Sequence, residues 1–314
     1  ADTSSIYTTD VSGTDDTAAN NTAFGYQAYD AVTTADEGTA VGSGALGATT
    51  TGAKNTAVGY VALTTNTTGS DNIAVGVASL YSNTTGAKNI AIGKSAAAAN
   101  TTGTRNITIG WEAYNNSDTE NDNIAIGYNA MTTNTAGGTE NTAVGNYSLD
   151  ALTSGDGNTA VGMSALSANS TGGYNTAVGR GALIANTTAQ NNTAVGNYSL
   201  GANTTGANNV AMGHAALDAN TTAADNTAVG TDALTANTTG AQNVAVGKDA
   251  LKANTTGTVN TAVGYDTLTV NTTGSYNTAM GPTALDANTT GGYNTGLGYR
   301  ALTANTTGSY NTAL

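Results

Sequence analysis

Few residues of this chain have types and a spacing that could support chemistry. His214 is the only histidine, and no serine or cysteine nucleophile motif lies near it, so we interpret it as a solvated turn residue rather than a catalytic base. Asp118, Glu120 and Asp122 alternate along the chain and could direct their oxygens at a cation. The glycine and distal glutamate of an EF-hand loop are absent, so these three residues are a weak candidate for a metal site. The alternative interpretation, which we favour, is a solvated acidic bulge. The sequence predicts no cofactor.

Surface aromatic residues are the next candidates. Tyr276, Tyr293 and Tyr310 recur at intervals of 17 residues. We expect them to form a stacked ladder that either contacts a glycan or a neighbouring subunit, or simply packs along the fold. Trp111 is the only tryptophan. It could contact a sugar or another chain, or it could pack beneath an irregular segment.

Asn-x-Ser/Thr motifs recur on an expected turn and are possible glycosylation sites. In a Thr-rich repeat these motifs arise by necessity, so the signal is weak. The representative acceptors are Asn66, Asn83, Asn100, Asn186 and Asn203.

The element that must position all of these residues is a tandem repeat. Asn-Thr-Ala-Val-Gly begins at Asn55 and returns, with small variations, every 17 residues from residue 21 onward. One copy, which starts at Asn123, has an extra residue. A fixed period of this kind decides the fold. We therefore divide the chain into a repeat array, 21–314, and a non-repeat segment, 1–20, expected to be a cap or an assembly strand.

Seventeen residues are too few for a helical pair but suffice for one coil of a β-solenoid. Counting from the Asn as position 1, Gly always occupies position 5, Leu dominates position 9, and Asn recurs at positions 1 and 12. Alternation around the Ala at position 3 predicts a strand. We therefore predict an all-β parallel β-solenoid, or β-roll, of about seventeen coils. Positions 2, 4 and 9 are expected to fill its interior, and the Asn amides to bond from coil to coil. The expected inward residues include Val144, Val161, Val178, Leu166 and Leu183.

The segments Asn89–Gly93 and Asn123–Gly127 both read Asn-Ile-Ala-Ile-Gly. They resemble the Asn-Ser-Val-Ala-Ile-Gly repeat of trimeric autotransporter adhesin heads, the YadA-like head, although the period here is longer. The repeat also looks like those of phage fibres and other surface proteins. The resemblance implies a left-handed parallel β-roll, an extracellular location and a trimer.

Composition narrows the function further. The net charge is −13, and the eight Lys and Arg residues do not cluster, which gives nucleic-acid binding no electrostatic basis. No apolar run is long enough for a membrane span, and there is no cysteine. We expect a secreted or cell-surface protein whose signal peptide has been removed. The alternatives to an extracellular filament or adhesive fibre are a trimeric adhesin or phage-fibre head that binds a cell-surface glycan or protein, and an ice-binding solenoid. An enzyme is disfavoured because no clustered carboxylates could flank a glycosidic bond.

The last segment suggests how copies could join. Asn311, Thr312, Ala313 and Leu314 are the first residues of a further coil, and no matching Asn-Thr-Ala-Val-Gly strand precedes Asn21. We therefore expect the C-terminal strand of one subunit to complete the first coil of the next, in a head-to-tail filament. A flat face of Ala and Gly at positions 3 and 5 is expected to admit a neighbouring chain laterally.

Overall fold

The computed structural model describes residues 6–7, 18–134 and 137–314. Internal packing divides the chain into two units, Ala1–Gly157 and Asn158–Leu314. Both are all-β parallel solenoids whose coils repeat every 17 residues, about seventeen coils in all, which confirms the predicted fold class. The described residues contain no helix, and so no helical segment that could cross a bilayer.

Each coil contributes one short strand. In the first unit the strands are β1 (Ile6–Tyr7), β2 (Thr22–Phe24), β3 (Thr39–Val41), β4 (Thr56–Val58), β5 (Ile73–Val75), β6 (Ile90–Ile92), β7 (Ile107–Ile109), β8 (Ile124–Ile126) and β9 (Thr142–Val144). In the second they are β10 (Thr159–Val161), β11 (Thr176–Val178), β12 (Thr193–Val195), β13 (Val210–Met212), β14 (Thr227–Val229), β15 (Val244–Val246), β16 (Thr261–Val263), β17 (Thr278–Met280), β18 (Thr295–Leu297) and β19 (Thr312–Ala313).

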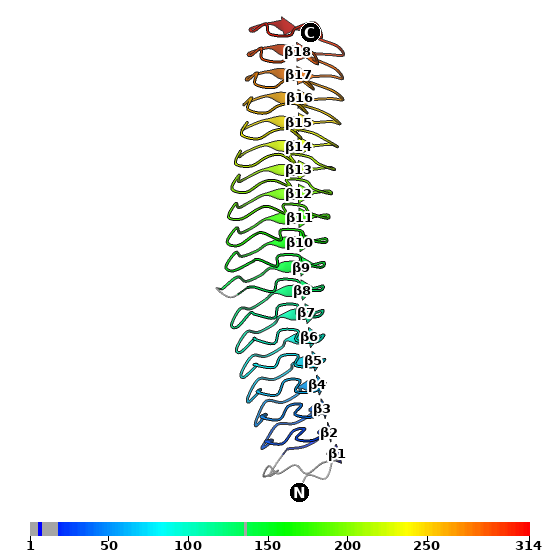
Figure 1. The fold of residues 1–314 in the computed structure, drawn as a ribbon, viewed down its shortest axis with the longest axis vertical. Coiled ribbons are helices and arrows are strands. Elements are labelled where there is room, and N and C mark those ends of the chain that lie inside the picture. Colours follow the sequence, from blue (N-terminus) through cyan, green and yellow to red (C-terminus); the bar gives the residue numbers. More distant parts are fainter. Residues whose placement is uncertain (1–5, 8–17, 135–136) are drawn as a thin grey trace. The chain divides into compact units, whose positions relative to one another are not determined.

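Within each unit, every strand pairs in parallel with the next strand along the chain, as Figure 1 shows. The register joins equivalent repeat positions, so Thr176 lies opposite Thr193 and Val178 opposite Val195. Identical or similar side chains therefore stack in columns about 4.8 Å apart.

Glycine at position 5 ends each strand for two reasons. Its φ lies between 119° and 143° throughout the array, a region that residues with a Cβ rarely adopt. A Cβ on Gly179 would also lie 2.5 Å from the carbonyl oxygen of Gly196 in the next coil. Non-glycine residues at positions 7, 9 and 17 have left-handed φ as well, for example Ser164 (56°), Leu183 (52°) and Asn191 (60°). Hydrogen bonds to the adjacent coils hold these turns in place.

The core consists of Ala at positions 3 and 8, Leu at position 9 and Asn at positions 1 and 12. Leu166 and Leu183 are fully buried, as predicted. The prediction that Val144, Val161 and Val178 point inward is wrong, because the buried residue of each strand is the central Ala. The interior of a 17-residue coil is narrow, and in most coils the Leu and Asn columns leave room there for little more than the methyl group of Ala, although Thr108 is buried at the same position. Residues at positions 2 and 4 therefore face outward.

Two columns of buried Asn link successive coils, as predicted. At position 1, Oδ1 of Asn175 accepts hydrogen bonds from the backbone N–H (3.0 Å) and the Nδ2 (3.3 Å) of Asn192. At position 12, Nδ2 of Asn186 donates to Oδ1 of Asn169 at 2.8 Å. Because these amides also bond backbone carbonyls of the turns, their burial is compensated by hydrogen bonds.

One irregularity of the first coils follows from a large residue. Tyr29 takes the place of Leu at position 9 and is fully buried. A Cβ on Gly38 would overlap the Tyr29 hydroxyl, which explains why Gly38 replaces the Asn otherwise found at position 1. The bulky Tyr at position 9 of one coil thus leaves no space for a side chain at position 1 of the next coil.

The segment 1–20 is described only in part. Ile6–Tyr7 forms β1, which pairs in parallel with Thr22–Ala23. The backbone N–H of Ala19 donates to Oδ1 of Asp36 at 2.6 Å. The expectation that no strand precedes Asn21 is therefore wrong, because β1 occupies that place. The remaining part of the segment, residues 1–5 and 8–17, lies outside the described residues.

Candidate functional site

The outward side chains of positions 2 and 4 form a strip in each unit, which we call the strand face. Its position-4 column is apolar throughout, whereas position 2 is Thr in most strands. Val161 and Val178 each keep 36% of their surface exposed, and Met212 keeps 44%. The parallel register places each position-4 side chain against its equivalent in the next coil, so the strip is continuous from strand to strand. The Ala at position 3 is buried and cannot form a lateral contact, which corrects the predicted Ala and Gly face.

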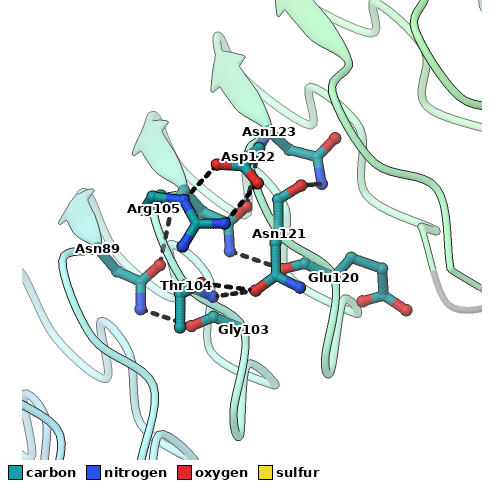
Figure 2. A network of polar contacts seen from close by, with 9 residues as sticks. Asn89, Gly103, Thr104, Arg105, Glu120, Asn121, Asp122 and Asn123 are labelled. Carbon is teal, nitrogen blue, oxygen red and sulfur yellow. Dashed lines mark hydrogen bonds and ion pairs between the residues drawn. The ribbon is translucent and has the colours of Figure 1, made fainter.

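The acidic residues Asp118, Glu120 and Asp122 lie in a turn that departs from the repeat, but their carboxylates do not converge. Figure 2 shows the Asp122 carboxylate meeting Arg105, with Nε to Oδ1 at 2.5 Å, while Glu120 lies apart from that pair. The Arg105 guanidinium lowers the pKa of Asp122, mainly through this hydrogen bond. Oδ1 of Asp118 instead accepts from the Thr101 hydroxyl.

Glu120 has a structural role that its sequence position does not reveal. Its side chain is buried and accepts hydrogen bonds from the backbone N–H groups of Asp118 (2.9 Å), Thr119 (3.0 Å) and Gly137 (3.2 Å). It therefore satisfies the donors of an irregular turn rather than binding a cation. No cluster of His, Asp or Glu with the geometry of a metal site occurs in the part of the chain that the structure describes.

Tyr114 supports the same turn from inside the core. It replaces Leu at position 9, and its hydroxyl accepts a hydrogen bond from Nδ2 of Asn123 at 2.8 Å. Ser117 occupies position 12 in this coil, where a larger Asn is usual. Burial raises the pKa of the Tyr114 hydroxyl far above its usual value, and the Glu120 charge adds to the shift. This tyrosine is a packing residue.

Trp111 is half exposed and belongs to a row of surface side chains. Nζ of Lys94 lies 4.9 Å from the centre of the Trp111 ring, a cation–π contact. Tyr128 meets Trp111 edge-on at 6.2 Å, and Tyr147 meets Tyr128 at 5.3 Å. Trp111 is therefore neither isolated nor packed beneath the irregular segment.

The predicted ladder of Tyr276, Tyr293 and Tyr310, which we call the Tyr column, is present. The ring centroids are 4.8 and 4.9 Å apart, with interplanar angles of 7° and 5°. Since the rings stack on one another, the column presents their edges to solvent. Whether it contacts a glycan or a second subunit remains a prediction.

His214 lies on the surface in a group of charges. Its Nδ1 is 3.8 Å from Oδ1 of Asp232. The other carboxylate oxygen of Asp232, Oδ2, is 3.8 Å from Nζ of Lys252. Lys252 in turn bonds Asp249 at 2.9 Å. This arrangement fits the interpretation of His214 as a solvated turn residue.

The Asn residues of the glycosylation motifs belong to the buried position-12 column. Nδ2 of Asn83 donates to Oδ1 of Asn66, and Nδ2 of Asn100 donates to Oδ1 of Asn83. Asn186 and Asn203 are bonded in the same way. The acceptor nitrogens are therefore inside the coil, so a glycan could be attached only before the coil forms.

The C-terminal residues extend the array by a partial coil. Thr312–Ala313 is β19, which pairs with β18 in register, and the backbone N–H of Asn311 donates to Oδ1 of Asn294 at 3.0 Å. Leu314 is 92% exposed. The segment thus has the same strand geometry as the other coils.

One surface feature was missed by the sequence reasoning. A hollow of about 400 Å³ lies over Ala98 and Ala99, lined by Tyr81, Ser82, Asn115 and Asn116 among others. The signal that could have revealed it is Ala98, which occupies the same repeat position as Tyr81 in the preceding coil and Asn115 in the next, since a small side chain in a stacked surface column leaves a gap. An aromatic ring beside amide groups could hold a small polar ligand such as a sugar.

Comparison with known proteins adds no relationship. No protein-family model matches the chain, and no curated protein matches it either.

Proposed function

We propose that this chain is a structural subunit of an extracellular, self-assembling filament or adhesive fibre, without catalysis. The observation that carries the proposal is the strand face, whose position-4 column is a continuous apolar strip on the outside of each unit. Extended apolar strips on soluble proteins mark association sites. Because the position-4 side chains of every copy have the same spacing along the solenoid, the strip of one chain can pack in register against the strip of another.

The strip of one unit offers a hydrophobic free energy of the same order as the cost of association. Covering the remaining exposed surface of one Val or Met on the strand face removes about 50 Å² from water, worth about 1 kcal/mol. Summed over the strands of one unit this gives about 10 kcal/mol, comparable to the rotational and translational cost of association. Thr side chains at position 2 add polar contacts at the edge of the strip.

The adhesin-like alternative draws support from the same surface. The resemblance of Asn89–Gly93 to the YadA-like head repeat favours lateral assembly into a trimer, in which a left-handed roll would present a ligand-binding surface to a cell. The hollow at Ala98 is one place where a small surface ligand could bind. An extracellular location agrees with the Asn-, Thr- and Gly-rich composition.

The strand face can be tested by adding charge. Val178→Lys combined with Val195→Lys places two ammonium groups on adjacent strands, β11 and β12. A matched control, Tyr174→Lys combined with Asn191→Lys, adds the same charge at exposed position-17 sites of neighbouring coils. We expect electron microscopy to show filaments or trimers of the intact chain and of the control, and single particles of the strand-face variant. A monomeric intact chain, or equal assembly of both variants, would refute lateral assembly.

The head-to-tail joint is a separate prediction. Because β1 already pairs with β2, β19 of one copy would have to pair with β1 of the next rather than complete its first coil. Deleting residues 311–314 removes β19 and leaves the strand face intact. Fibres as long as those of the intact chain would exclude this joint, whereas shorter assemblies with unchanged width would support it.

An ice-binding role is the second candidate, because the Thr residues at position 2 face outward on the strand face and recur once per coil. Val210 and Val244 interrupt this Thr column in the second unit. Thermal hysteresis of the purified chain distinguishes the two functions directly: a filament subunit shows none, and an ice-binding protein shows a depression of the freezing point.

A further inference from the structure

The Tyr column combines three features that are not found together elsewhere in the described residues. Three phenol rings stand in direct contact in successive coils, 4.8 and 4.9 Å apart and nearly parallel. All three are exposed, by 48%, 51% and 78%. Their backbones share a left-handed φ of 59° to 63°, which fixes the direction in which each ring leaves the coil.

We propose that the Tyr column is a site of oxidative dityrosine cross-linking between successive coils. The co-reactant is a peroxide-driven one-electron oxidant, such as a peroxidase supplied with hydrogen peroxide. This inference goes beyond the proposed function and does not depend on lateral assembly, because both partners lie in one chain.

The reaction balances as follows. Each of two phenols gives up one electron and its hydroxyl proton to form a phenoxyl radical. The two radicals join through a C–C bond between carbons ortho to the hydroxyls, and each ring returns its ortho proton to the oxygen to restore the phenol. One hydrogen peroxide takes up the two electrons and two protons and becomes two waters.

The geometry favours coupling within the column over coupling at random. In a ladder with parallel rings, equivalent ortho carbons are separated by about the same distance as the centroids, so a tilt of the exposed ring edges brings them together. A radical held beside its partner reacts at a high effective concentration. Tyr174 occupies the same repeat position and is 65% exposed, but Asn191 and not a tyrosine follows it in the next coil.

One other pair of tyrosine rings is in contact in the described chain, Tyr128 and Tyr147, at 5.3 Å and 83°. Because this pair could also couple, Tyr147→Phe is introduced into every protein used in the test. The ring contact with Tyr128 is kept by the phenylalanine, while the second phenol is lost.

The consequence of cross-linking is a covalent tie along the axis of the solenoid. A bond from Tyr276 to Tyr293, or from Tyr293 to Tyr310, joins residues 17 apart and prevents the two successive coils that carry them from separating. Since each coil of a repeat protein contacts only its neighbours, such a tie opposes the stepwise unfolding of the array.

The test compares the Tyr147→Phe protein with the same protein carrying Tyr293→Phe or Tyr174→Phe. Each is oxidised at low protein concentration with peroxidase and hydrogen peroxide, and the monomer is purified and digested with trypsin. Cleavage after Lys252 and Arg300 separates Tyr293 from Tyr310, so their cross-link joins peptides 253–300 and 301–314. Mass spectrometry identifies that product, and dityrosine fluorescence gives the total yield.

We expect Tyr293→Phe to lower the dityrosine yield about tenfold, because Tyr276 and Tyr310 are then two coils apart. Phenylalanine keeps the ring stack, so the variant should fold with an unchanged circular dichroism spectrum. Tyr174→Phe should leave the yield unchanged, and oxidation should raise the melting temperature only where Tyr293 is present. A yield that falls equally in both variants would overturn the proposal. So would the absence both of the joined peptides and of a peptide 253–300 that has lost two hydrogens because Tyr276 and Tyr293 are coupled within it.

Discussion

The buried Asn columns are expected to dominate the stability of each coil, and Asn192 offers the sharpest test. Its side-chain amide makes four hydrogen bonds: to Oδ1 of Asn175 and the carbonyl of Gly206 as donor, and from the N–H and Nδ2 of Asn209 as acceptor. Asn192→Ala removes all four. The change also leaves a void in a fully buried position.

The magnitude follows from what each partner has left. The Gly206 carbonyl still accepts from Asn203, and Nδ2 of Asn209 still donates to the Ala223 carbonyl. The backbone N–H of Asn209 loses the acceptor it has in this structure, Oδ1 of Asn192. An orphaned buried donor costs about 1–3 kcal/mol and each of the other three lost bonds about 1 kcal/mol, so we expect a total of about 4–6 kcal/mol.

The matched control is Asn197→Ala, the same substitution at an exposed residue, with an expected effect within about 0.5 kcal/mol. Hydrogen exchange on the full chain reads out the loss locally. The backbone N–H of Asn209 should exchange with solvent at least about 100-fold faster in Asn192→Ala than in Asn197→Ala. Equal protection of that amide in the two variants would refute the account of the Asn column.

Three further predictions concern glycine packing, column compensation and pH. Gly179→Ala should destabilise the fold by about 3 kcal/mol or more, because the new methyl meets the Gly196 carbonyl and φ is 135°; an unchanged urea midpoint would contradict this. Gly38→Asn should destabilise by itself and recover when combined with Tyr29→Leu, as a double-mutant cycle of melting temperatures would show; additive effects would argue against the compensation. Burial raises the pKa of Asp150, so its carboxyl favours the folded state below the usual Asp pKa and that advantage is lost as pH rises to the raised value. Asp150→Asn should therefore stabilise the chain at neutral pH but not at about pH 3, and an equal effect at both values would exclude this explanation.

The sequence predicted the fold class because a repeat constrains it strongly. The 17-residue period, the Gly at position 5 and the Asn at positions 1 and 12 can each be explained by a single structural requirement, and all of these requirements are met by a stack of parallel coils. The Tyr column followed from the same logic, since any residue repeated at the period must stack.

The orientation of the strand was predicted wrongly because size was equated with burial. Position 4 varies from Phe24 to Val178 to Met212, whereas position 3 is almost always Ala. Tolerance of size marks a solvent-facing position, and constancy of a small residue marks a confined interior. The Thr residues that alternate with Val or Ile at position 2 give the same indication.

The acidic turn shows what one residue type cannot reveal. Asp118, Glu120 and Asp122 look alike in sequence, but each carboxylate has different partners. Asp118 accepts from a hydroxyl, Glu120 from three backbone N–H groups, and Asp122 pairs with an arginine. Which partner each carboxylate has depends on the neighbouring coils. The glycosylation motifs were ambiguous for a related reason, because a turn Asn can point either into or out of a solenoid.

The most direct test of the assembly surface uses a single thiol, because the chain has no cysteine. Val178→Cys places it on the strand face, Ala177→Cys in the core and Asn191→Cys on an exposed turn. In dilute protein a maleimide should label positions 178 and 191 rapidly and position 177 hardly at all. At concentrations where filaments or trimers form, labelling of position 178 should slow by at least about tenfold, while position 191 stays reactive. Labelling of position 178 that is as slow as that of position 177 in dilute protein, or that does not change on assembly, would contradict the account.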